Sequence, residues 1–277
     1  MLSPREIDEA VDRALAEDIG PGDITSLATL PPDAPGRAVF LAKDTGVLAG
    51  MPVLERVFAR VDPSVRLELL RHDGEDVTPG TELAVARGAA ASILTAERTS
   101  LNFLQFLSGI ATRTARFVAL VQGTSARVVD TRKTVPGLRS LSKYAVRVGG
   151  GTNHRFGLYD GVLIKDNHIR AAGGITPAVQ QARLRAHHLL KVEVETETLE
   201  QVEEALDAGA DIVMLDNMDL ATLTRAVDLC RGRALTEASG GINEQTIRSV
   251  AETGVDLISV GALTHSVTAL DISLDWD

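Results

Sequence analysis

The sequence of 277 residues has one cysteine, few aromatic residues and no long apolar run. Cys230 alone cannot form an intramolecular disulfide or a cysteine-based metal cluster, and its apolar neighbours predict a buried, inert thiol. With six Phe, two Tyr and one Trp, Val, Leu, Ile and Ala must fill the core, which favours parallel strands and helices over an aromatic-rich β-sandwich. No stretch of about 18 apolar residues is available to span a membrane. The N-terminal residues are charged and helix-forming, unlike a signal peptide, so we expect a cytoplasmic protein without a membrane partner.

One segment concentrates positive charge in an otherwise acidic chain. The formal net charge is −10, yet residues 130–168 contain seven Lys or Arg, two His and six Gly against three Asp. Positive charge on glycine-rich backbone indicates a pocket for a small polyanion. A nucleic-acid surface is not expected, because the surrounding acidic protein would repel a long phosphate chain.

The first part of the chain predicts a small layer of helices and antiparallel strands. Ser3 and Glu6 flank Pro4 in the pattern of a capping box that begins a helix. From residues 37 to 87 apolar and polar residues alternate, as in strands of a half-exposed sheet. A long helical pattern follows over residues 92–122, with a bend expected at Gly109. The last segment, 271–277, carries Trp276 and is expected to pack back on this layer.

The second part of the chain predicts a parallel βα structure. Six short apolar runs recur about every 20 residues, mostly separated by stretches that can form helices. Each run ends in a charged or small polar residue. A doubly wound sheet shows this only near its switch point, whereas a barrel gathers the carboxyl end of every strand at one mouth. We therefore expect a small α/β barrel of six or seven strands.

Two glycine-containing turns follow the last two predicted strands. They consist of Ser239, Gly240 and Gly241, and of Val260, Gly261 and Ala262. Glycine allows a ligand to approach the backbone closely, and free N–H groups at such turns favour an anion. In barrels this pair of late loops often binds phosphate, although a glycine can also simply end a strand.

Two carboxylates, Glu195 and Asp216, end neighbouring predicted strands, so they should converge. Beside a phosphate site they suggest Mg²⁺, which prefers oxygen ligands shared with substrate phosphates. They could instead stabilise a cationic transition state directly, or form an ordinary salt bridge with Lys165 or Lys133. Glu193 should face the same way but lie deeper in the barrel.

A cationic set is predicted around this mouth. Its members are Arg132, Lys133, His154, Arg155 and Lys165. Arginine suits bidentate recognition of carboxylate or phosphate, and lysine acts as a point charge. Solvated surface charges are the alternative. It is weakened because Arg155 lies in the glycine-rich loop GGGTNHRFG and Lys165 ends an apolar strand.

Several motifs in order along the chain resemble those of quinolinate phosphoribosyltransferase, also called carboxylating nicotinate-nucleotide pyrophosphorylase. They are EDIGPGDITS (17–26), TAERTSLNFLQFLSGIAT (95–112), the whole segment 130–168, VEVET (192–196), MLDN (214–217), EASGGI (237–242) and VGALTHS (260–266). The resemblance implies an open α/β sandwich over residues 1–108, joined by residues 267–277, and an α/β barrel over residues 109–266 that carries the active site. It implies transfer of the phosphoribosyl group of phosphoribosyl pyrophosphate to quinolinate in de novo NAD synthesis. The products are nicotinate mononucleotide, pyrophosphate and CO₂, and Mg²⁺ is the cofactor.

The resemblance also assigns roles to individual residues. Quinolinate binding falls to Thr131, Arg132, His154, Arg155 and Lys165, and to Arg98 supplied by the neighbouring subunit of a homodimer. Lys133 is assigned to the pyrophosphate side, Glu195 and Asp216 to the ribose and the metal, and the two glycine turns to the 5′-phosphate. A trimer of dimers is the larger assembly that the resemblance suggests.

Three alternatives remain open from the sequence. A paralogue of the same fold, found with molybdate transport genes, should lack the intact TRKT, NHR and LIKDNH groups that this chain has. A phosphate-binding barrel isomerase or aldolase would need an acid–base pair at the mouth, or a desolvated Lys165 free of carboxylate partners. A non-catalytic binding protein would not need groups that stabilise both the leaving pyrophosphate and the ribose C1.

Overall fold

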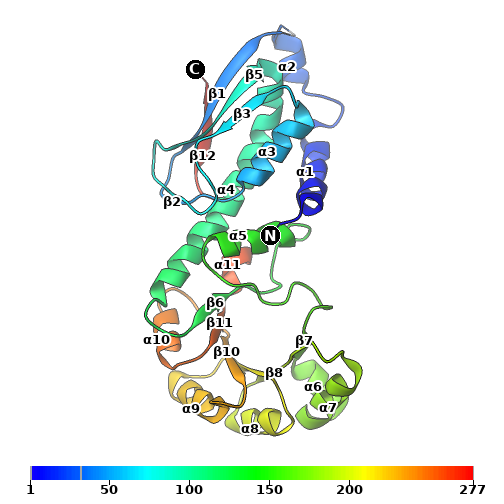
Figure 1. Ribbon diagram of the computed structural model, residues 1–277, viewed down its shortest axis with the longest axis vertical. Coiled ribbons are helices and arrows are strands. Elements are labelled where there is room, and N and C mark those ends of the chain that lie inside the picture. Colours follow the sequence, from blue (N-terminus) through cyan, green and yellow to red (C-terminus); the bar gives the residue numbers. More distant parts are fainter. Residues whose placement is uncertain (1, 32, 277) are drawn as a thin grey trace. The chain divides into compact units, whose positions relative to one another are not determined.

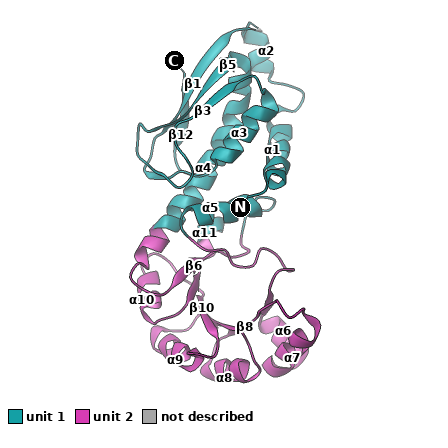
Figure 2. Cartoon of the chain, viewed as in Figure 1, with its two compact units in different colours: residues 1–115, 134–150, 263–277 teal, residues 116–133, 151–262 magenta. Residues whose placement is uncertain are grey.

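The computed structural model describes residues 2–31 and 33–276. The chain forms two compact units, shown in different colours in Figure 2. The first unit holds residues 1–115, 134–150 and 263–277, and the second holds residues 116–133 and 151–262. This division differs from the one expected from the sequence mainly in residues 134–150, which contact the first unit although they lie between barrel segments in the chain.

The first unit is built on an antiparallel sheet with the strand order β12-β1-β5-β3. The strands are β1 (Pro35–Ala42), β3 (Arg66–Leu69), β5 (Glu82–Ala89) and β12 (Ile272–Trp276). Two shorter strands, β2 (Gly46–Val47) and β4 (Asp76–Val77), form a separate antiparallel pair. β12 pairs with β1 over its whole length, so the C-terminal segment supplies one edge of this sheet.

The unit that contains this sheet also contains helices (Figure 1). They are α1 (Pro4–Ile19), α2 (Ile24–Thr29), α3 (Met51–Val61), α5 (Arg139–Val148) and the long helix α4 (Ala90–Leu120), which continues into the second unit. The predicted capping box is confirmed, because the Ser3 side chain accepts from Glu6 N and Glu6 reaches back to Ser3 N.

Gly109 lies inside the continuous helix α4 and serves close packing. A Cβ atom at this position would lie well under 3.0 Å from the carbonyl oxygen of Thr268. Glycine is therefore required because another backbone segment touches the helix there, a reason that the residue pattern alone could not distinguish from a bend.

The second unit contains a six-stranded parallel sheet with the order β6-β11-β10-β9-β8-β7. The strands are β6 (Arg127–Val129), β7 (Val162–Ile164), β8 (Val192–Thr196), β9 (Ile212–Asp216), β10 (Leu235–Ser239) and β11 (Leu257–Ser259). Within the described residues β6 and β7 are the two edges and do not pair with each other. The small parallel α/β architecture predicted from the sequence is confirmed, with six strands.

Helices separate successive strands of this sheet and pack on its outer face (Figure 1). They are α6 (Asp166–Ala172), α7 (Ile175–Arg185), α8 (Leu199–Asp207), α9 (Leu220–Cys230) and α10 (Ile247–Glu252). The short helix α11 (Ala262–His265) follows β11, and most of it belongs to the first unit. The strands carry buried Val, Ile, Leu and Ala toward the helices, as expected for a parallel sheet. No helix in the part of the chain that the structure describes has the length and apolarity needed to cross a membrane.

Some of the polar residues expected at the ends of apolar runs belong to the strands themselves, whereas Asp130, Lys165 and Gly261 follow β6, β7 and β11 as expected. β8 includes Glu195, β9 ends at Asp216 and β10 extends to Ser239. Because side chains alternate along a strand, Glu193 and Glu195 share one face, as do Glu237 and Ser239. The apolar runs visible in the sequence were shorter than the strands because polar residues occupy the inward face.

Candidate active site

A cavity of about 350 Å³ opens at the carboxyl ends of the parallel strands. It is lined by Thr131, Arg132, Lys133, His154, Arg155, Leu163, Lys165, Met214, Glu237, Ser239 and Ser259. The structure therefore brings together all five residues of the predicted set, together with Thr131 and Ser239. Catalytic groups of parallel barrels lie at this end of the strands.

A second cavity in the same unit, of about 490 Å³, lies where β9 and β10 begin. Its lining includes Asp211, Arg233 and Asp256, beside the buried Cys230. This is the end of the strands opposite to the predicted cations, so the second cavity does not contain the candidate site.

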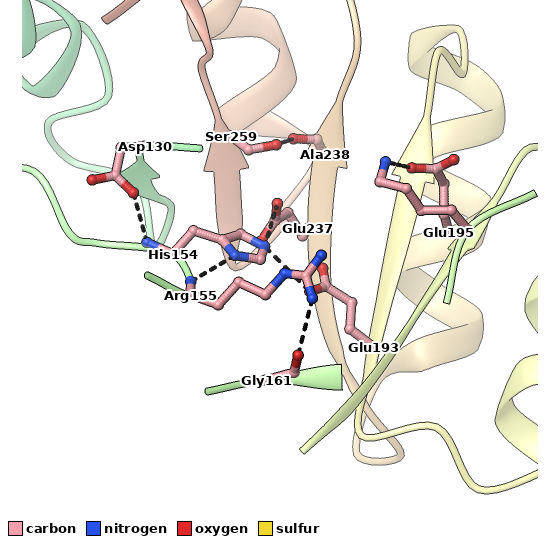
Figure 3. A network of polar contacts seen from close by, with 10 residues as sticks. Asp130, His154, Arg155, Gly161, Glu193, Glu195, Glu237, Ala238 and Ser259 are labelled. Carbon is pink, nitrogen blue, oxygen red and sulfur yellow. Dashed lines mark hydrogen bonds and ion pairs between the residues drawn. The ribbon is translucent and has the colours of Figure 1, made fainter. Parts of the chain in front are cut away.

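The glycine-rich loop of the site is anchored on a buried aspartate (Figure 3). Asp130 is 0% exposed and accepts hydrogen bonds from Asn153 Nδ2 at 2.6 Å and from the backbone N–H of His154 at 2.9 Å. Arg155 Nη1 donates to the carbonyl oxygen of Gly161 at 3.0 Å. These bonds fix the loop backbone and present His154 and Arg155 to the cavity.

Both ring nitrogens of His154 are engaged. Nδ1 accepts the backbone N–H of Arg155 at 2.7 Å, so the ring proton resides on Nε2. Nε2 lies 3.2 Å from a carboxylate oxygen of Glu193 and 3.5 Å from Glu237 Oε1. His154 is thus a neutral donor toward two carboxyl groups and adds no formal positive charge to the cavity.

Glu193 and Glu237 lie beneath the cavity and are almost completely buried, with 5% and 1% of their surface exposed. One oxygen of each, Glu193 Oε1 and Glu237 Oε1, has no hydrogen-bond partner. Burial and, next, the negative charge of Glu193 raise the pKa of Glu237 to about 7. Glu237 is therefore mostly protonated below about pH 7, where an exposed glutamate would be ionised.

The cluster of His154, Glu193 and Glu237 has the spacing of a metal site but not its chemistry. One ligand atom from each residue lies within 4.8 Å of the others. A histidine that ligates a metal through Nε2 donates its Nδ1–H to an acceptor. Here Nδ1 accepts from an N–H group, so Nε2 carries a proton instead of an available lone pair. The cluster therefore shares protons and does not fit a metal ion.

Glu195 and Asp216 offer a better set for a hard cation, because they supply only oxygen ligands. Lys165 Nζ forms an ion pair with Glu195, and Asp216 accepts from Asn217 Nδ2 at 2.7 Å. The Glu195 side chain is 14% exposed and that of Lys165 is 46% exposed, so solvent and ligands can reach this pair. The salt bridge with Lys165 considered from the sequence is present, and it leaves Asp216 as a separate carboxylate at the end of the next strand.

The loops after β9 and β10 are joined at the glycine turns. Asn217 N donates to Ser239 O at 2.9 Å, and Gly240 adopts a φ of 95°. A Cβ atom on Gly240 would come well under 3.0 Å from the Asn217 side chain. After the next strand, α11 begins at Ala262, directly after the turn. After Gly241 a short turn over residues 244–246 precedes α10.

The positive charges in the cavity disfavour one another. The pKa of Arg155 is lowered, first by burial and then by the nearby charge of Arg132. Since the partly buried guanidinium group of Arg155 is repelled by the positive charge of Arg132, an anion bound between them would lower the electrostatic energy of the site.

Some predicted site residues do not line the cavity, and some lining residues were not predicted. Arg98 lies on α4 of the first unit with 60% of its side chain exposed. Glu237 was not among the predicted site residues, although its place two residues before Ser239 on one strand puts both side chains on the same face. Leu163 and Met214 lacked any such signal, because apolar residues occur on both faces of these strands.

Comparison with known proteins covers nearly the whole chain. Residues 23–108 match the N-terminal domain of quinolinate phosphoribosyl transferase, and residues 110–275 match its C-terminal domain. The probable carboxylating nicotinate-nucleotide pyrophosphorylase of Bacillus subtilis (strain 168) is 45% identical over 270 residues, which cover 98% of this chain and 93% of that protein. The chloroplastic carboxylating nicotinate-nucleotide pyrophosphorylase of Arabidopsis thaliana is 46% identical over 291 residues, with 98% and 83% covered.

Solved structures agree. The nicotinate-nucleotide pyrophosphorylase from Francisella tularensis superimposes with a TM-score of 0.94 at 40% identity, covering 100% of this chain and 98% of that one. With both domains matched in order and with full-length relatives above 40% identity, the resemblance predicted from the sequence is confirmed. The chain belongs to the quinolinate phosphoribosyl transferase family.

Proposed function

We propose that the cavity at the carboxyl ends of β7 to β11 is where this protein joins quinolinate to a phosphoribosyl group. The protein is a quinolinate phosphoribosyltransferase (decarboxylating) of de novo NAD biosynthesis, and its products are nicotinate mononucleotide, pyrophosphate and CO₂. The observation that carries the proposal is the convergence of Arg132, Lys133, Arg155 and Lys165 on one cavity in a chain of net charge −10.

Quinolinate is a dianion, which explains why several cations meet in one cavity. A carboxylate buried without a partner is costly, so each carboxylate of the substrate needs its own donors. Arg132, Arg155 and Lys165 are proposed to bind the two carboxylates, with Thr131 lining the pocket. His154 is also proposed to bind quinolinate. A direct hydrogen bond would require its ring to give up its contact with Arg155 N or with Glu193.

The phosphoribosyl donor is proposed to lie toward the strand ends that carry Glu195 and Asp216. As pyrophosphate leaves toward Lys133, positive charge develops at the ribose C1, and the two carboxylates stabilise it while the pyridine nitrogen attacks. The turns at residues 239–241 and 260–262 are proposed to bind the 5′-phosphate through backbone N–H groups.

Magnesium is the cofactor in this proposal. Glu195 and Asp216 would hold it, because they are the reachable carboxylates at the mouth and offer oxygen ligands only. Bound with the oxygens of pyrophosphate, Mg²⁺ would neutralise charge on the leaving group.

The geometry speaks against an aldolase-type reaction. A lysine that forms a Schiff base needs a lowered pKa, obtained by desolvation or by a neighbouring cation. Lys165 is instead 46% exposed and forms an ion pair with Glu195, so it is neither desolvated nor free of a carboxylate partner.

The direct test mixes the pure protein, quinolinate, phosphoribosyl pyrophosphate and Mg²⁺, and measures nicotinate mononucleotide and CO₂. Nicotinate replaces quinolinate in the parallel reaction. Turnover with nicotinate but not with quinolinate would overturn the proposal.

The proposed binding of the dicarboxylate can be tested with Arg155→Ala. We expect the KM for quinolinate to rise at least about 100-fold, in line with the loss of a buried charged hydrogen-bond partner, while the KM for phosphoribosyl pyrophosphate changes less than about threefold. Arg231→Ala removes an exposed arginine paired with Asp228 and is the control, expected to match the wild type. Equal rises in both KM values for Arg155→Ala would contradict the proposed division of roles.

Arg98 is proposed to act across a homodimer. Arg98→Ala and Arg155→Ala should each have little activity at a quinolinate concentration near the wild-type KM, but a mixed dimer contains one site with both arginines intact. Heterodimers isolated through two different tags should regain up to about half of the activity of the wild-type dimer, because one of their two sites is intact. Absence of rescue in confirmed heterodimers would place Arg98 outside the site.

Two further expectations remain predictions. A trimer of dimers would appear as a sixfold mass in light scattering. The cytoplasmic location can be tested by fractionating source cells, since relatives of this family include chloroplastic and mitochondrial forms.

A further inference from the structure

The reaction requires a proton that the proposed roles leave unassigned. Once CO₂ departs from C2 of the pyridine ring, the bonding electron pair stays on that carbon beside the positively charged nitrogen. The product carries hydrogen at C2, so an acid in the cavity must supply a proton there.

Few groups that line the cavity are suitable acids. Arginine does not release its proton in proteins, and the hydroxyl groups of Thr131, Ser239 and Ser259 are weak acids. Lys165 is held by Glu195, and Lys133 is proposed for pyrophosphate. Among the described residues that line the cavity, Glu237 is the only carboxyl group.

The surroundings of Glu237 keep it protonated. It is 1% exposed, and its Oε1 has no hydrogen-bond partner. His154 offers a single N–H to both buried glutamates, at 3.2 Å from Glu193 and 3.5 Å from Glu237, and one neutral donor cannot offset two buried negative charges. Burial and the charge of Glu193 raise the pKa of Glu237, while contacts with His154, Ser259 and Lys165 act in the opposite direction.

We propose that Glu237 is the catalytic acid that protonates C2 of the pyridine ring after decarboxylation. The inference rests on the proposed function, because it places quinolinate in this cavity. In the step, the bond from C2 to the carboxylate carbon breaks and CO₂ leaves. The electron pair at C2 then takes the proton of Glu237, which forms the C2–H bond and leaves a Glu237 carboxylate.

His154 and Glu193 have a positioning role in this step. The Nε2–H of His154 lies between the two carboxyl groups and faces the new negative charge on Glu237 (Figure 3). Glu193 keeps the proton on Glu237 before the step through its own charge. When the product leaves, Glu237 regains a proton from water entering the open cavity.

The test compares wild type with Glu237→Gln, which keeps the shape of the side chain but cannot donate an acidic proton. We expect kcat for nicotinate mononucleotide to fall about 100- to 1000-fold, the usual contribution of a general acid, with both KM values within about threefold. The wild-type kcat should decline on the alkaline side at or above pH 7, because the bound dianion further favours protonated Glu237. Glu237→Gln should lack this decline.

Further variants separate acid catalysis from a structural role. Glu237→Asp keeps an acid at a greater distance, so it should retain the alkaline decline with an intermediate kcat. Glu193→Gln removes the neighbouring charge, so it should move the decline to lower pH. Glu203→Gln, at an exposed position on α8, should leave kcat unchanged.

The outcomes are decisive. A kcat for Glu237→Gln within threefold of the wild type, or an alkaline decline that persists in this variant, would overturn the role of Glu237 and leave the proposed function intact. No turnover of quinolinate by the wild type would refute the proposed function and this inference together.

Discussion

Replacing Glu237 with glutamine should make the stability of the protein less sensitive to pH. The pKa of this carboxyl group is raised from 4.5 to about 7 in the folded protein, because it is buried beside Glu193. A group that binds its proton more tightly in the folded state contributes most stability below its unfolded pKa and loses that contribution as pH rises through the folded pKa. The interval between 4.5 and about 7, at about 1.4 kcal/mol per pH unit, corresponds to about 3 kcal/mol.

Part of that loss has already occurred at pH 5, so roughly 2–3 kcal/mol should be lost between pH 5 and pH 8 in the wild type. Glutamine stays neutral over this pH range, so Glu237→Gln should not show this loss of stability. Urea unfolding followed by circular dichroism at both pH values measures the free energy of unfolding of wild type, Glu237→Gln and the exposed control Glu203→Gln. From pH 5 to pH 8 the free energy of unfolding of Glu237→Gln should rise relative to that of wild type by roughly 2–3 kcal/mol. The free energy of unfolding of Glu203→Gln should keep a constant difference from that of wild type. Parallel losses in wild type and Glu237→Gln would refute the assignment of a buried, protonated glutamic acid at this position.

Three other predictions follow from local geometry. Gly240→Ala should raise the KM for phosphoribosyl pyrophosphate at least about tenfold, because the new Cβ would displace the Asn217 side chain at a φ of 95°; an unchanged KM would argue against a phosphate site at this turn. Gly109→Ala should lower the free energy of unfolding by about 1–3 kcal/mol in urea titrations, because the methyl group would collide with the Thr268 carbonyl, and a stabilised variant would show that the helix is not in contact there. Burial raises the pKa of Cys230 to about 11, so the native protein should react with a thiol reagent at pH 8 at least about 100-fold more slowly than the protein in urea; equal rates would place the thiol at the surface.

Much of the fold could be predicted from the sequence, because hydrophobic periodicity and capping residues indicate where helices and strands lie. The capping box at Ser3 and the βα repeat after residue 90 predicted the right elements, whereas the alternation over residues 37–87 did not locate the helix α3 between the strands. The sequence predicts six or seven strands instead of one number, because an apolar run marks only part of a strand. Polar inward residues such as Glu193 and Glu237 interrupt the runs, and they do so where the site is built.

The candidate site was predictable as a set of residues but not as a set of contacts. Arg132, Lys133, Arg155 and Lys165 share one cavity as expected. The neutral state of His154 could not be inferred, because it depends on the backbone N–H of the next residue folding back onto Nδ1. The pairing of Lys165 with Glu195 was one of several alternatives, since sequence places both at strand ends without saying which partners lie nearest.

The pairing of β12 with β1 has a consequence for the order in which the chain folds during synthesis. β1 and β5 emerge from the ribosome early, but their sheet lacks one edge until β12 has been made, and nearly all of the second unit is translated in between. At about 5–20 residues per second, the unfinished sheet stays exposed for many seconds after β5 is complete. In the parallel unit β7 to β11 pair in chain order and can assemble in that interval, and only β6 waits for its late partner β11. Ribosome-bound chains stopped before residue 272 should therefore protect the second unit from protease earlier than the first.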